Sequence, residues 1–122
     1  MGKYEKPVVM EKAELAEGVF LASGGNGLDV KIEVVEQGFT IVHVTFTNKG
    51  SEDYNLNKFI LTFNKDVSFN TDPQASNISA TCSGREIIGI PNDSVIWAGD
   101  SYTYIAHLGQ TGLVLQSYQI NP

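Results

Sequence analysis

The sequence predicts an all-β protein, built as one antiparallel β-sandwich with an N-terminal extension. Three observations support this prediction. After residue 27, apolar and polar residues alternate along short segments, as they do in half-buried strands. Clusters of Gly, Asn, Asp and Ser separate these segments, and no convincing helical pattern follows residue 27. The result is about eight or nine short strands joined by turns, a number typical of a sandwich.

Residues 1–27 differ from the rest of the chain and are expected to form the extension. The stretch EKAELAEG is charged and rich in helix formers, and VFLASGG follows it. The GGNG run at residues 24–27 predicts a turn or linker, because glycine loses much conformational entropy when it is ordered. Residues 28–122 then form the sandwich domain.

The strongest strand signals come early in this domain. LDVKIEVVE at residues 28–36 places Val30, Ile32 and Val34 on one face. FTIVHVTFT at residues 39–47 is rich in β-branched and aromatic residues. A turn at NKGS leads to KFILTFN. Further strands are expected near residues 67–69, 77–83, 85–90, 101–108 and 112–120, and VIWAGD at residues 95–100 leads into the strand at 101–108.

Composition and charge exclude several classes of protein. The net charge is −6, the eight Lys and Arg residues are scattered, and no basic patch is visible, which argues against nucleic acid as a partner. The sequence contains no run of about 18 apolar residues, the length that a membrane-spanning helix needs. The single cysteine, Cys82, cannot form an internal disulfide and has no zinc-site spacing, so we expect a buried thiol.

No catalytic motif accompanies the two histidines, His43 and His107, which lie within predicted strands. We therefore expect no enzyme activity and no cofactor. The oxygen-bearing residues 70–72, 91–93 and Asp100 are of the type that calcium prefers, but Asx turns explain them without an ion.

Aromatic residues are the best candidates for ligand binding. Trp97, Tyr102 and Tyr104 cluster in sequence, and Tyr54 follows the first turn. Aromatic rings exposed on a sheet can stack on sugar rings, whereas the same rings in a core would only fill space. Trp97 adjoins Ile96 and precedes a turn, a position that favours packing in the core or at an edge.

The stretch VTFTNKGSEDYNLNKFILTFN, at residues 44–64, resembles the early strands of bacterial carbohydrate-binding modules of the cellulose-binding sandwich type. GREIIGI and SVIWAGDSYTYIAHLGQTG are similar to that family's closing strands, and many bacterial immunoglobulin-like domains carry equivalents. The resemblance spans residues 30–120. Cellulose-binding members present several exposed tryptophans, but this chain has one tryptophan, so the resemblance implies a shorter soluble glycan or no glycan.

Two functions follow as expectations. The first is a non-catalytic extracellular or cell-surface module that binds carbohydrate through Trp97, Tyr102, Tyr104 and Tyr54. The second is a structural or protein-interaction domain of immunoglobulin-like type without a glycan site. The chain shows no signal-peptide pattern at its start, although either role favours secretion or display at the cell surface.

The Gly24-Gly25 pair of the extension resembles the double glycine at which some bacterial export leaders end. The opening of the extension is similar to small clostridial-type peptides. A flexible arm and an additional strand are the alternatives. We expect residues 19–21 to dock on the sandwich and residues 1–6 to be mobile, because the apolar side chains gather in the former.

Overall fold

The computed structural model describes residues 14–15, 19–25, 27–70 and 78–122. All regular structure in these ranges is β, so no helix within them could cross a membrane. The strands are β1 (Glu14–Leu15), β2 (Val19–Gly25), β3 (Leu28–Glu36), β4 (Thr40–Asn48), β5 (Tyr54–Asn55), β6 (Phe59–Phe63), β7 (Ile78–Ser83), β8 (Glu86–Pro91), β9 (Val95–Ile96), β10 (Ser101–Leu108) and β11 (Leu115–Ile120).

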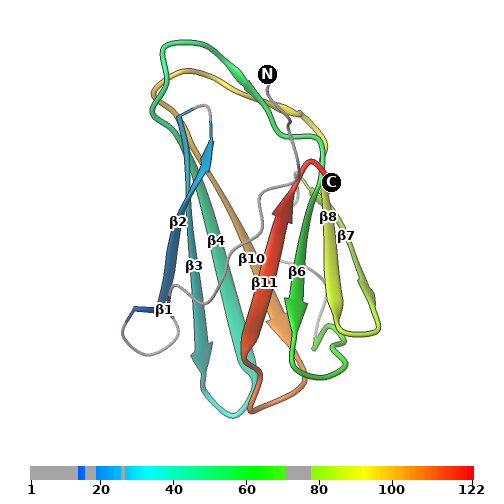
Figure 1. Ribbon diagram of the computed structural model, residues 1–122. Helices are drawn as coiled ribbons and strands as arrows, with labels where there is room; N and C mark the ends of the chain where they lie inside the picture. Colours follow the sequence, from blue (N-terminus) through cyan, green and yellow to red (C-terminus); the bar gives the residue numbers. More distant parts are fainter. Residues whose placement is uncertain (1–13, 16–18, 26, 71–77) are drawn as a thin grey trace.

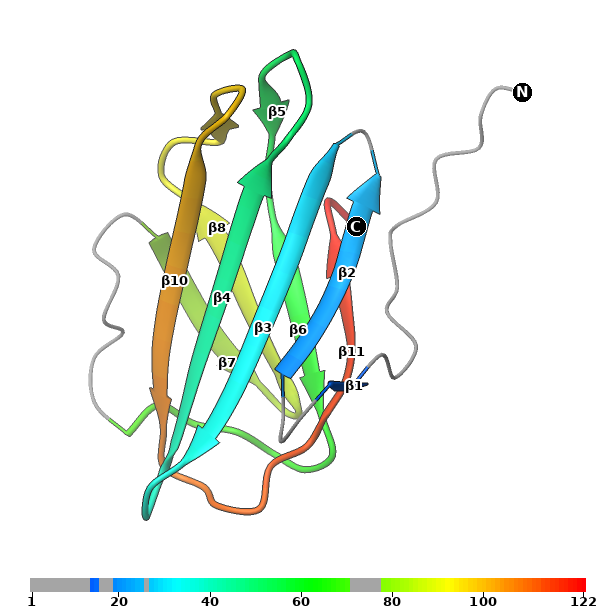
Figure 2. The same cartoon turned by 90° about the vertical axis from the view of Figure 1, so that its left-hand side faces the viewer.

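Two antiparallel sheets pack face to face (Figure 1). The larger sheet has the strand order β1-β2-β3-β4-β10, and the smaller has the order β11-β6-β8-β7. Figure 2 shows the larger sheet from its outer side, with β10 at its edge. The short strands β5 and β9 pair with each other at the end of the sandwich where β4 finishes (Figure 2). The predicted antiparallel sandwich is confirmed.

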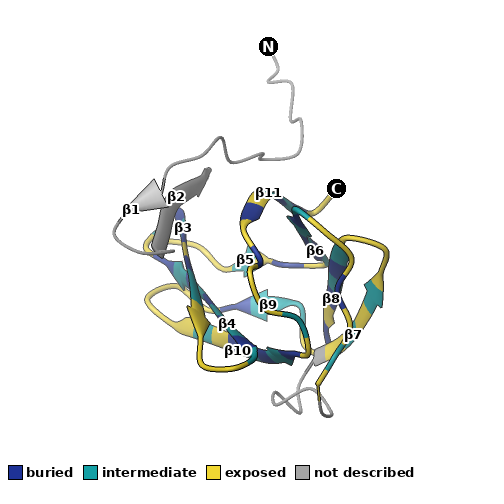
Figure 3. Ribbon diagram, turned by 90° about the horizontal axis from the view of Figure 1, so that it is seen from below, coloured by how far each residue is buried: buried dark blue, intermediate teal, exposed yellow. Residues whose placement is uncertain are grey.

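The core lies between the sheets, where the buried residues face one another (Figure 3). In β4, every second residue from Thr40 to Asn48 is buried, which is the alternation that the sequence predicts. The Phe59 ring centre lies 5.2 Å from that of Phe46 and 5.7 Å from that of Tyr104. Opposite Phe59, position 89 must be glycine, because an added Cβ would lie 2.3 Å from the Phe59 ring. These aromatic contacts join the two sheets.

One segment differs from its sequence-based interpretation. Residues 67–69 form no strand, and only an isolated bridge joins Phe69 to Leu108. The glycine run, expected to be a turn or linker, lies at a turn, since β2 continues to Gly25 and pairs with β3. Gly27 in that turn has a φ of 85°, and a Cβ there would lie 2.7 Å from the Gly50 amide nitrogen. That turn therefore requires glycine.

The expected docking of residues 19–21 agrees with the pairing of β2 against β3, from Val19 opposite Glu33 to Gly25 opposite Leu28. The expected mobility of residues 1–6 falls outside the described residues. The division of the chain at residue 27 stays a prediction.

Candidate functional site

A buried asparagine organises the end of the sandwich next to β5 and β9. Asn48, the last residue of β4, is fully buried, and its side-chain amide donates hydrogen bonds to the carbonyls of Glu52 and Ile96 at 2.8 and 2.9 Å. Its side-chain oxygen accepts from the Gly50 amide at 2.9 Å. A buried polar group must be satisfied in this way, since an unpaired one is costly. Asn48 therefore fixes the loops at this end relative to the core.

The loop that connects β9 to β10 is a tight turn. The Asp100 amide donates to the Trp97 carbonyl at 2.9 Å, and Gly99 between them has a φ of 87°. The Gly99 amide donates to the Asn48 carbonyl at 2.8 Å, while the Asp100 carbonyl accepts from the Asn48 amide at 2.9 Å. Asp53 accepts a further hydrogen bond from Ala98 at 3.3 Å. The backbone that carries Trp97 is therefore held on several sides.

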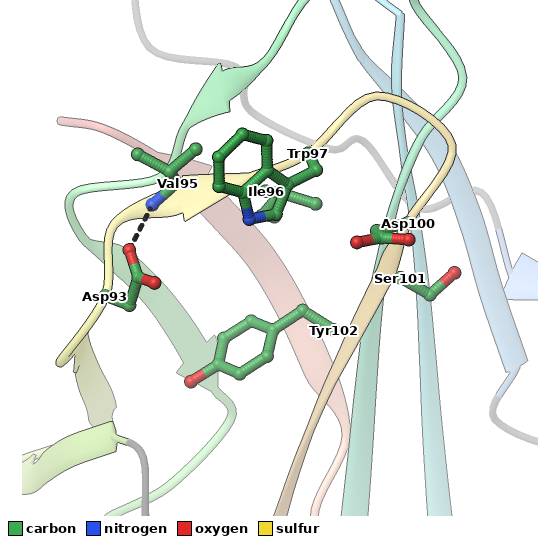
Figure 4. A pocket seen from close by; sticks show the side chains of 7 residues that line it. All are labelled: Asp93, Val95, Ile96, Trp97, Asp100, Ser101 and Tyr102. Atoms are coloured by element: carbon green, nitrogen blue, oxygen red, sulfur yellow. Dashed lines mark hydrogen bonds between the residues drawn. The ribbon is translucent and has the colours of Figure 1, made fainter.

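This turn forms one wall of a pocket of about 160 Å³. Its lining comes from one continuous stretch of chain, comprising Asp93, Val95, Ile96, Trp97, Asp100, Ser101 and Tyr102. In Figure 4 the Trp97 and Tyr102 rings lie on opposite sides of the pocket, and the carboxylates of Asp93 and Asp100 lie at its two ends. The Trp97 side chain is unusually open for an indole, at 61% exposed.

Tyr102 is held more firmly than Trp97. Its ring stacks on Phe46 with centroids 6.4 Å apart and planes 25° apart. Burial, and to a lesser degree the negative charge of Asp93, raises the pKa of Tyr102 to about 12. Tyr102 is therefore a neutral phenol at ordinary pH. Asp93 is itself oriented by the Val95 amide, which donates to its Oδ1 at 3.1 Å.

The structure brings together two of the four aromatic residues that the sequence singles out. Trp97 and Tyr102 line the same pocket. The sequence favours packing of Trp97 in the core or at an edge, and the first of these two positions is wrong because the side chain is mostly exposed. Tyr104 is fully buried between the sheets, so its ring does not reach the surface. Tyr54 is half-buried on β5 and packs against the core, outside the pocket lining.

The polar members of the pocket have a different origin. Asp93 and Asp100 stand out in the sequence as turn residues and as candidate calcium ligands, and Ser101 carries no signal of its own. Within the described ranges, no three His, Cys, Asp or Glu residues gather closely enough to hold a metal ion. Asp72, the other aspartate in the calcium hypothesis besides these two, lies outside those ranges.

The histidines and the cysteine lie away from the pocket lining. Nδ1 of His43 is 3.9 Å from Oε1 of Glu33 on the neighbouring strand, and the His107 ring meets Phe39 edge-on at 5.5 Å. Cys82 is only partly buried, packs against the core, and has a pKa raised to about 11 by desolvation. The thiol, expected from the sequence to be buried, is therefore only half-buried.

Comparison with known proteins supports the fold but assigns no function. No protein-family model matches the chain, and no curated protein matches it. Two crystal structures of the GH20 exo-β-N-acetylglucosaminidase from Vibrio harveyi are similar, one of an inactive mutant and one in complex with N-acetylglucosamine. Each has a TM-score of 0.53 and 20% sequence identity over 69% of this chain. The chain spans only 13% of the length of that enzyme, so the likeness supports a β-sandwich-like module.

Proposed function

We propose that this chain is a non-catalytic carbohydrate-binding module, secreted or displayed at a cell surface, that holds one sugar unit against Trp97. The observation that carries the proposal is the 61% exposed indole at the mouth of a pocket that also presents carboxylates and a tyrosine. A sugar ring has apolar C–H faces and polar edges. An aromatic wall with flanking hydrogen-bond acceptors matches both.

The position of Trp97 favours a binding role over a packing role. A large aromatic side chain left mostly in water contributes little to folding. Its backbone is nevertheless fixed by the turn that Asn48 and Asp53 anchor. Because this backbone is already fixed, only the side-chain torsions of Trp97 remain to be ordered when a ligand arrives, which limits the entropy cost of binding.

The size of the pocket indicates what part of a glycan fits. At about 160 Å³ it is smaller than the roughly 300–1,000 Å³ typical of drug-sized ligand sites. One exposed tryptophan also offers a single stacking surface. A terminal or single sugar unit of a soluble glycan therefore fits better than the flat surface of crystalline cellulose.

The similar enzyme from Vibrio harveyi acts on a carbohydrate. Because the likeness is one of fold alone, it supports carbohydrate as the class of ligand only to that extent.

A glycan array probed with the full chain, followed by calorimetric titration of the best-bound glycan, tests this function. Trp97→Ala should weaken binding at least about tenfold, equivalent to about 1.4 kcal/mol. The matched control is Ile90→Ala, which truncates another side chain that is about half exposed but lies on the smaller sheet. Equal affinity of wild type and Trp97→Ala would contradict the proposal.

A second candidate function, the protein-interaction domain, is favoured by β10. This strand ends the larger sheet, contains no Asp, Glu, Lys, Arg, proline or bulge, and pairs with β4 in unbroken register. Among the described residues, its outer edge is occupied only near its end, where Phe69 bridges to Leu108 and the Asn70 amide donates to the His107 carbonyl at 2.7 Å. Proteins usually protect such an edge, because its backbone can pair with another strand. An array without a bound glycan would favour this candidate over the first.

A further inference from the structure

We propose that the pocket selects sugars that carry a protonated amine, the glucosamine class, over neutral and acidic sugars. This inference rests on the proposed function and names the ligand class of the same pocket. It follows from the charges that line the pocket and from their arrangement around the two rings.

The charges of the pocket lining are all of one sign. Asp93 and Asp100 contribute two carboxylates, and none of the other residues that line the pocket is Lys, Arg or His. Across the described part of the chain, the ion pairs involve other residues, so neither carboxylate is neutralised by a neighbouring cation. The whole chain adds a net charge of −6. An anionic sugar would therefore meet repulsion, and a cationic one would meet attraction.

The arrangement of the carboxylates suits an ammonium group held beside a sugar ring. In Figure 4 they lie at opposite ends of the space between Trp97 and Tyr102. A sugar that stacks on the indole thus directs its equatorial substituents towards one carboxylate or the other. A carboxylate is a stronger partner for a charged donor than for a neutral hydroxyl or acetamide. The faces of the two aromatic rings add a cation–π attraction.

The charge of Asp93 acts within the pocket. It is one of the causes that raise the pKa of the Tyr102 hydroxyl, so its field reaches the Tyr102 side of the cavity. Asp93 is also oriented by its bond from the Val95 amide at 3.1 Å. An oriented carboxylate close to the ligand space discriminates charge without first having to move.

A lysine side chain offers the same ammonium group, so the sugar ring must be tested separately from the amine. The pocket favours the sugar because the rings of Trp97 and Tyr102 can both contact its carbon skeleton. An extended alkyl chain would leave much of this surface unused. The Ser101 hydroxyl takes no part, since it points away from the pocket and shares a hydrogen bond with the Thr47 hydroxyl at 2.9 Å.

The test compares three trisaccharides of equal length by calorimetric titration of the full chain: triglucosamine, tri-N-acetylglucosamine and cellotriose. With the amine protonated, triglucosamine should bind at least about tenfold more tightly than the other two. The advantage should shrink in high salt, because partly exposed charges are screened. It should also disappear above the pKa of the sugar amine. Lysine amide, the fourth ligand, should bind more weakly than triglucosamine.

Two variants assign the selectivity to the carboxylates. Asp93→Asn and Asp100→Asn should reduce the preference for triglucosamine while binding of cellotriose is kept. Asparagine at position 93 retains an oxygen for the Val95 amide, so the fold is expected to be unchanged, and a thermal melt checks this. Asp66→Asn is the matched control, because Asp66 is exposed near the β7–β8 turn, away from the pocket.

The outcomes separate the two proposals. Equal affinity for the three trisaccharides overturns the amine preference and leaves the carbohydrate-binding function in place. Failure of every trisaccharide and every arrayed glycan overturns both. Lysine amide that binds as tightly as triglucosamine shows an amine site rather than a sugar site, and overturns the inference.

Discussion

At the scale of single residues, the two tyrosines of β10 show that a difference of two positions along a strand decides whether a ring reaches the pocket or fills the core. Tyr102 and Tyr104 occupy alternate positions on the inner side of one strand. Tyr102 lies at the end of the sandwich, where its ring reaches the pocket, whereas Tyr104 lies deeper and is fully buried. The sequence shows that they share a face, but the depth of each along the sandwich depends on where the opposite sheet ends. Strand periodicity carries no information about that.

The Tyr104 hydroxyl gives a residue-scale prediction. It is buried and, among the described residues, makes no hydrogen bond. An unsatisfied buried hydroxyl costs about 1–3 kcal/mol relative to a satisfied one. Tyr104→Phe should therefore be at least as stable as the wild type in urea titrations and should bind sugar equally well. A loss of more than about 1 kcal/mol would show that the hydroxyl has a partner.

At the scale of elements, strands with regular alternation were predictable, and short or irregular ones were not. Residues 28–36 match β3, and 101–108 match β10. Residues 67–69 carry strand-like side chains but meet β10 only at its end, through one bridge from Phe69 to Leu108 and a hydrogen bond from the Asn70 amide to the His107 carbonyl. Among the pocket residues, the aromatic pair was predictable as candidates. The carboxylates were not, because turn chemistry explains aspartate equally well.

The N-terminal strand gives a prediction for this scale. β2 pairs with β3 along most of its length, and the core residues of β3, Val30 and Ile32, are almost fully buried. A chain that begins at Gly25 loses this pairing and exposes the β3 edge. Its melting temperature should fall by roughly ten degrees or more, since about 2 kcal/mol corresponds to a shift of that size. An unchanged melting curve would show that residues 1–24 are an appendage.

At the scale of the whole molecule, the buried tyrosines set an alkaline limit to stability. Burial raises the pKa of Tyr102 and of Tyr118 to about 12, and that of Tyr104 higher still. In the unfolded chain these phenols ionise near 10. The folded state therefore holds more protons above that pH. Its stability is complete below about pH 10 and is lost as the pH rises towards the folded pKa values.

A titration of tyrosinate absorbance, followed in parallel with circular dichroism, checks this prediction. Of the five tyrosines, Tyr104 and Tyr118 should ionise only as the β-sheet signal disappears, whereas Tyr102, whose ring reaches the pocket, should ionise at its raised pKa of about 12. The loss of stability at alkaline pH should be smaller in Tyr104→Phe, which lacks the phenol whose pKa is raised the most. Ionisation of all five before any change in dichroism would contradict the burial of these rings.

The residues that line the pocket lie close together in the sequence, which has a consequence for engineering and for divergence. All seven residues that line it fall between Asp93 and Tyr102, and Asn48 ties this stretch to the frame from outside. Replacement of its exposed members Asp93, Trp97 and Asp100 would change the recognition surface, while Ile96 and Tyr102 keep their packing in the core. Libraries varied only at these exposed positions could thus yield new specificities on a constant scaffold, as antibody loops do on theirs.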